Sequence, residues 1–227
     1  MLRVFHGGRL VAALLLLAAA GAQATPTTNI WNPSTDVQAP GVLHLGIDNY
    51  FSLFQNATNQ VAFPTDIGLT YGLGGGFEVG IDLLEPSANP FVFNAKWGLP
   101  ERGATPALAL GIQAVGTTRA TQGNIAYALV AKSFGSIGRL TLGGYTGRES
   151  FLGEDNAGVI AAWDRSFGKR WWASIDYASG NNAYGALALG AAYRFTPRIS
   201  LLFGYVIFND SSINPNDTFT TQVDIDL

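Results

Sequence analysis

Acidic side chains occupy every second position in several apolar stretches of this sequence. The last eight residues, TTQVDIDL, place Asp224 and Asp226 between Val223, Ile225 and Leu227. Asp48 and Asp82 lie in the same way within GVLHLGIDNYFSLF and FEVGIDLL. Successive side chains of a strand point to opposite faces, so these acids would share a face turned away from the apolar residues. Carboxylates gathered in this way attract cations, and three of them could bind a divalent ion, although no ligand spacing here specifies one.

Nucleophilic catalysis would need a histidine beside a serine or an aspartate. His44 is the one histidine that remains once the leader described below is removed. Asp48 and Ser52 lie on its face but roughly 13 Å and 26 Å further along a strand, at ~3.3 Å per residue. A partner from a neighbouring strand stays open, although no motif marks one. The sequence has no cysteine, phosphate loop, zinc spacing or haem-attachment motif, so we expect neither an enzyme nor a cofactor or metal site.

The N-terminus has the pattern of a secretory signal peptide. Arg3 and Arg9 precede the apolar run LVAALLLLAAAG, and AQA follows, which predicts a signal peptide over residues 1–24. The run is shorter than the ~20 residues that span a bilayer. The full chain has 13 basic and 16 acidic residues, so the loss of two arginines leaves a net charge of −5. This balance argues against nucleic acid as a partner.

Twelve alternating segments fill residues 41–227, and charged residues make up only 13% of the chain, against about 25% in soluble domains. No later apolar run is long enough for a membrane helix. The weakest segment contains Gly143-Gly144, which suggests a bulge. The expected strands lie near residues 41–54, 61–73, 77–84, 91–99, 107–116, 124–134, 139–146, 158–167, 171–178, 185–195, 199–208 and 217–227.

The connections between these segments alternate in length. Mostly short ones lie at 74–76, 100–106, 135–138, 168–170 and 196–198, and mostly longer polar ones at 55–60, 85–90, 117–124, 147–157, 179–185 and 208–217. Short turns at one rim and longer loops at the other are typical of outer-membrane barrels. The chain resembles the porin-like outer-membrane β-barrel proteins of Gram-negative bacteria over residues 41–227. The resemblance implies an all-β, transmembrane, antiparallel up-and-down barrel of about twelve strands, with the bilayer and the barrel assembly machinery as partners. Such proteins often end in an aromatic residue, whereas this chain ends in Leu227.

A soluble, lipocalin-like barrel is the alternative, with its apolar face turned inward. The second face of each segment is mostly Gly, Ala, Ser and Thr, which fits a crowded interior better than a hydrated surface. Aromatic residues of the apolar face also gather at both segment ends, as in the two belts of a membrane barrel. The belt beside the short turns comprises Tyr71, Phe77, Trp97, Trp171, Tyr193 and Phe195, and the belt beside the longer loops comprises Phe51, Phe63, Phe91, Tyr177, Tyr205 and Phe219.

Ionisable residues of the second face should therefore line the lumen. We expect a cation-attracting patch of Asp48, Asp66, Asp82 and Asp176 in its middle and upper part. The lower lumen should hold His44, Glu78, Lys96, Lys132, Asp164, Arg194, Asp224 and Asp226. These lower charges could simply pair, as Glu78 with Lys96. Water and Lys96, Lys132 or Arg194 would compensate Asp224 and Asp226.

Two segments could obstruct such a lumen. Residues 25–40, which contain Trp31 and three prolines, are either an irregular periplasmic segment or a lumen plug. The 147–157 loop, with Phe151 and Leu152, either folds inward or contacts a partner. We expect an outer-membrane channel for small polar or cationic solutes. The alternative is a non-conducting barrel that acts as a structural anchor or binds a partner.

Overall fold

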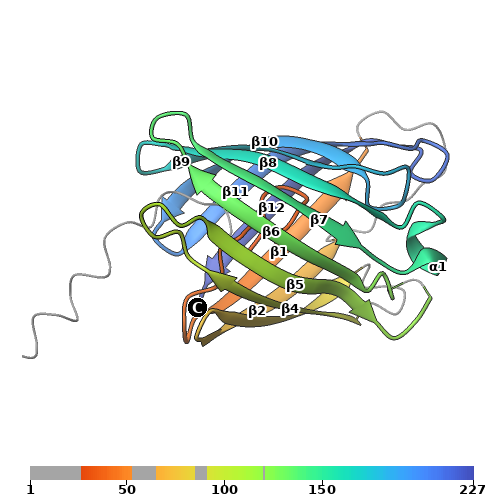
Figure 1. Ribbon diagram of the computed structural model, residues 1–227, viewed down its shortest axis with the longest axis horizontal. Helices are drawn as coiled ribbons and strands as arrows, with labels where there is room; N and C mark the ends of the chain where they lie inside the picture. The colour runs from red at the N-terminus through yellow and green to blue at the C-terminus, as the bar shows by residue number, and fades with distance from the viewer. Residues whose placement is uncertain (1–26, 53–64, 85–90, 120) are drawn as a thin grey trace, which may run out of the picture.

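The computed structural model describes residues 27–227 except 53–64, 85–90 and 120 (Figure 1). The expected signal peptide, the connections at 55–60 and 85–90, and Phe63 lie outside the described residues. Twelve strands form: β1 Leu43–Phe51, β2 Asp66–Gly74, β3 Phe77–Leu84, β4 Phe91–Leu99, β5 Ala107–Gly116, β6 Ile125–Ser133, β7 Arg139–Thr146, β8 Ala157–Phe167, β9 Trp171–Ala178, β10 Ala186–Thr196, β11 Ile199–Phe208 and β12 Thr218–Asp226. A short helix, α1 (Glu149–Leu152), lies in the loop before β8. None of the described helical residues forms a helix long and apolar enough to cross a membrane.

The strands form one closed antiparallel barrel in which each pairs with its neighbours in sequence. β1 and β12 close the sheet in continuous register, from His44 opposite Asp226 to Phe51 opposite Phe219. This confirms the expected all-β, up-and-down barrel of twelve strands. The short turns and the C-terminus lie at one end, which we call the short-turn rim, and α1 lies at the other (Figure 1).

Large apolar side chains cover the outer face of the barrel. Leu110 is 54% exposed, Leu142 62% and Val159 58%, each alternating with a more buried neighbour. Aromatic side chains are also exposed near strand ends, among them Phe77 and Trp171. Their rings contact those of neighbouring strands, Phe77 with Trp97 and Trp171 with Tyr193.

The lumen is divided into a packed part and a polar part. Trp172, Leu202 and Val206 pack together on the inner face of β9–β11. Tyr127 and Leu129 of β6 belong to a second buried apolar cluster. The expectation of an interior lined mainly by small residues holds for β10, whose buried inward residues include Ala186, Ala188 and Ala192, but is wrong along β6, β9 and β11, where large side chains fill the space. The charged residues of β1–β4 face the rest of the lumen.

Register shifts mark three places in the sheet, and the Gly143-Gly144 pair is not one of them. They occur at Gly72/Gly74, Phe93/Ala95 and Arg194/Thr196. β7 pairs without interruption on both sides, so the suggested bulge is wrong. Gly143 instead permits a close approach, because a Cβ there would collide with the carbonyl oxygen of Ala128.

Candidate functional site

Residues 27–40, which we call the N-terminal segment, lie inside the barrel. Ile30 is 1% exposed and Asn32 is fully buried. Asp176 of β9, also fully buried, binds three successive backbone N–H groups of this segment. Its carboxylate accepts from the backbone nitrogens of Ile30 at 2.9 Å, Trp31 at 3.3 Å and Asn32 at 2.9 Å, and from the Asn32 side chain at 2.7 Å. Asp176 therefore binds the N-terminal segment and does not form the single acidic patch with Asp48, Asp66 and Asp82 that the sequence predicted.

Trp31 fixes the same segment against β1, β11 and the loop after β9. Its indole nitrogen donates to the carbonyl oxygen of Tyr184 at 2.8 Å. Its ring lies edge-on to Tyr50 of β1 and Phe208 of β11, with centroids 5.6 and 5.5 Å away. The Gln222 side chain of β12 donates to the Ile30 carbonyl at 2.9 Å. Strands that are distant in sequence thus converge on Ile30 and Trp31.

Lys96 and Glu78 form a buried pair that also binds the N-terminal segment. Their charged atoms are 3.1 Å apart, on the neighbouring strands β4 and β3. The ammonium group also donates to the Thr27 carbonyl at 2.8 Å, and Glu78 accepts from the Gln38 backbone nitrogen at 2.6 Å. Each charged group therefore forms a hydrogen bond with the backbone as well as an ion pair. A buried ion pair needs such additional hydrogen bonds to offset the cost of removing both charges from water.

Arg139 is a lumen residue that the sequence reasoning missed. Its guanidinium lies 2.5 Å from Asp36 of the N-terminal segment and 2.8 Å from Asp164 of β8. Asp164 also accepts from the indole nitrogen of Trp172 at 3.2 Å. Arg139 lies two residues before the inward-facing Thr141 and four before Gly143 on β7, and this alternation could have placed it in the lumen.

His44 compensates the two acids of the terminal strand, whereas the expected lysines pair elsewhere, and the charge of Arg194 also acts on Asp226. Its ring nitrogens lie 3.3 Å from Asp224 and 2.9 Å from Asp226, across the seam between β1 and β12. Ser200 donates to Asp224 at 3.1 Å and not to the histidine, so these described residues do not form a serine–histidine nucleophile pair. Arg194 lies on the same face as Ser200 and Asp224 by register.

Lys132 lies on the outer face of β6, which corrects its placement in the lower lumen. Leu129 and Ala131 are buried inward, whereas Val130 is exposed on the outside with Lys132. The Lys132 ammonium group reaches the next turn, 2.7 Å from Glu101. The error arose because the inner face of β6 is itself apolar, so apolar character does not distinguish its two faces.

Asp48, Asp66 and Asp82 face a cavity of about 330 Å³ between the N-terminal segment and β1–β6. We call this space the acidic cavity. Asp48 of β1 is directly opposite Asp66 of β2, and Asp82 of β3 is directly opposite Gly68 of β2. The Asp82 carboxylate leans over Gly68, where a Cβ would come within 2.5 Å of it. Glycines at 46, 68 and 80 line the same wall, so backbone rather than side chains bounds this part of the cavity.

These three carboxylates form no ion pair within the described part of the chain, since no salt bridge there involves Asp48, Asp66 or Asp82. Asn94 donates to Asp82, and one oxygen of Asp66 is buried without a hydrogen-bond partner. Among the described residues, no three acidic, histidine or cysteine side chains are arranged to hold a metal ion.

The α1 loop turns two apolar side chains inward at the end opposite the short-turn rim. Leu152 is 1% exposed and packs in the cluster with Tyr145 and Ile160. Phe151 contacts that cluster and lines the acidic cavity. Inward folding and contact with a partner were the two expectations for this loop, and these two side chains fold inward.

Comparisons with known proteins give a structural likeness alone. No family model matches the sequence, and no curated protein matches it. A mutant of Rh. blastica porin is 18% identical over 71% of this chain and 55% of its own, with a TM-score of 0.39. A triple mutant of Rhodopseudomonas blastica porin is 16% identical over 92% and 69%, with a TM-score of 0.41. The chain thus spans about half the length of the first of these porins.

Proposed function

We propose that this protein is an exported outer-membrane channel of the porin-like kind, which passes small polar or cationic solutes. The exposed apolar outer face and its aromatic strand ends support a bilayer as the surrounding medium. The observation that carries the proposal is the acidic cavity inside a closed barrel. Its three carboxylates form no salt bridge among the described residues and face open volume. Water and passing cations would then compensate their charge.

The N-terminal segment narrows this pathway in the proposal. It is held against the wall by Asp176, Lys96 and Arg139, while the acidic cavity remains along β1–β6. Solutes would therefore pass between the segment and the glycine-lined wall. A constriction of this kind favours small solutes and leaves the carboxylates as the main source of selectivity.

Planar-bilayer recording tests the proposal. In a salt gradient, the mature protein should show cation-selective steps, and the Asp48→Asn/Asp66→Asn/Asp82→Asn variant should shift the reversal potential toward zero. Glu149→Gln/Glu154→Gln/Asp210→Asn removes the same number of charges from loop positions beyond the strands, and should shift it much less. A silent bilayer, also after deletion of residues 25–40, would overturn the channel and favour the non-conducting anchor.

The membrane placement has a separate test. The folded protein should stay in solution only with detergent or lipid, because its outer face exposes many leucine, valine and phenylalanine side chains. A folded, soluble monomer without detergent would contradict it.

A further inference from the structure

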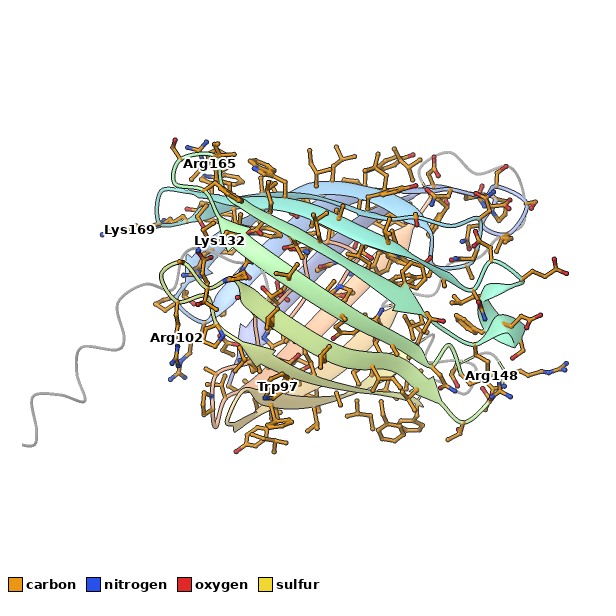
Figure 2. All side chains as sticks on the ribbon, viewed as in Figure 1. Trp97, Arg102, Lys132, Arg148, Arg165 and Lys169 are labelled. Carbon is orange, nitrogen blue, oxygen red and sulfur yellow. The ribbon has the colours of Figure 1, made fainter. Side chains whose placement is uncertain are left out.

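Basic side chains gather at one end of the barrel. Apart from Arg139 and Arg194, which are on the inner face, six of them lie in or beside the connections at the short-turn rim: Arg102, Lys132, Arg165, Lys169, Arg170 and Arg198. Figure 2 shows four of these, Arg102, Lys132, Arg165 and Lys169, at the same end of the molecule, with Arg148 at the other. Glu101 is the acidic residue in these turns, and it pairs with Lys132, while the inward-facing Asp164 and Asp226 nearby pair with Arg139 and His44. The other five take part in none of the salt bridges within the described residues.

The opposite end carries the reverse charge. Its described connections contain Arg119 and Arg148, and five acids: Glu149, Glu154, Asp155, Asp210 and Asp217. Arg148 is bound to the Gln122 side chain at 2.6 Å. The two rims therefore differ in sign, which the overall acidic composition conceals.

Two of the rim cations lie over outward-facing aromatic rings. The Arg165 guanidinium is 4.9 Å from the centre of the Phe167 ring. Arg170 donates to the Tyr193 hydroxyl at 2.8 Å, and its guanidinium lies 6.0 Å from that ring's centre. Tyr193 itself packs edge-on against Trp171 and Phe195. Each cation thus lies beside the aromatic girdle, at the depth where headgroup phosphates meet such a girdle.

We propose that the short-turn rim binds the phosphates of anionic phospholipid headgroups, through Arg165, Lys169 and Arg170 above the aromatic side chains of β8–β10. The inference rests on the proposed membrane placement and is independent of conduction. Guanidinium groups bind phosphate in two-pronged geometry, and each Lys or Arg near an anionic membrane surface strengthens the attraction. The acidic opposite rim would repel the same headgroups, so anionic lipid would gather in one leaflet.

Quenching of tryptophan fluorescence by brominated lipid measures this preference. Trp163 and Trp171 lie close to the rim on the outer face. The mature protein is refolded into phosphatidylcholine vesicles with increasing brominated phosphatidylglycerol. The wild type should bind phosphatidylglycerol preferentially, and Arg165→Gln/Lys169→Gln/Arg170→Gln should weaken that relative binding roughly fivefold or more. Arg119→Gln/Arg148→Gln, a control that removes two cations from the other rim, should retain it.

Several results would overturn the inference. They are equal quenching by the two lipids in the wild type, an equal loss in the control, or competition by inorganic phosphate alone. If the triple variant fails to fold, rising salt must still weaken the preference of the wild type, and a preference insensitive to salt would contradict an electrostatic site. A protein that never inserts into vesicles would instead contradict the proposed function. Insertion without lipid preference contradicts only this inference.

Discussion

At the scale of single residues, Asp176 shows how one buried carboxylate can organise a segment without regular structure. It accepts hydrogen bonds from the backbone of three successive residues, Ile30, Trp31 and Asn32. Hydrogen bonds to a charged group contribute more than neutral ones, and buried N–H groups without acceptors are destabilising. The segment therefore depends on the negative charge of Asp176, and not only on the shape of the lumen.

Asp176→Asn should loosen the N-terminal segment. The amide keeps one acceptor oxygen but turns an NH₂ group toward backbone donors, so we expect a loss of about 2 kcal/mol or more in the free energy of unfolding. Urea unfolding in detergent measures the loss, and limited proteolysis should cut residues 27–40 faster. Glu154→Gln makes the matching carboxylate-to-amide change at an exposed loop position and should have little effect. A wild-type proteolysis rate in Asp176→Asn would contradict this role.

The interactions of Glu101 at the short-turn rim should contribute a small, acid-sensitive part of the free energy of unfolding. Hydrogen bonds from Lys132 and Ser133 lower the pKa of its carboxyl below the ordinary value of 4.5. A pKa lowered by folding contributes stability above the unfolded pKa, and this contribution is lost as the pH falls through the lowered pKa. The site is exposed, so the contribution should be under ~1 kcal/mol. The stability difference between wild type and Glu101→Gln should thus be measurable at pH 7 and vanish in strong acid, and a difference independent of pH would contradict it.

At the scale of elements, alternation predicted the strands well but gave the faces only where the two faces differ. β1, β3 and β12 combine an apolar face with a polar one, and their acids do face inward. β6 reads IAYALVAKS, apolar on both faces, and its lysine was assigned to the wrong one. His44 shows a second limit, because its contacts with Asp224 and Asp226 depend on the register between β1 and β12. Sequence alternation sets the face of a residue, while the register sets its partner.

Single cysteines can test the faces of β6, since the chain contains no cysteine of its own. Ala128→Cys and Val130→Cys should react with a lipid-soluble maleimide in vesicles and resist a membrane-impermeant one. Leu129→Cys and Ala131→Cys, which lie in the packed lumen, should react slowly with both until the protein is unfolded. Labelling efficiencies by mass spectrometry would show the alternation. The opposite alternation would place Lys132 back inside the lumen.

At the scale of the whole molecule, segments from outside the sheet occupy the lumen at two places. The N-terminal segment is bound to the wall by charges, and the α1 loop places Phe151 and Leu152 inward. The sequence did not decide whether either segment enters the lumen, because a plug and a periplasmic tail can have the same composition. The choice depends on lumen partners such as Asp176 and Arg139, whose convergence requires the closed barrel.

Two obstructions in one pathway should act in series. Deletion of residues 25–40, or Phe151→Ser/Leu152→Ser, should each raise single-channel conductance only in part, because the remaining obstruction then limits the current. The combined variant should exceed the sum of the two increases. Phe134→Ser/Ile137→Ser, on an exposed turn, makes the same chemical change outside the lumen and should leave conductance unchanged. Heat-modifiable gel mobility would verify that each barrel is closed. If the deletion alone gave the full increase, Phe151 and Leu152 would lie outside the pathway, and the ions would pass the α1 loop elsewhere.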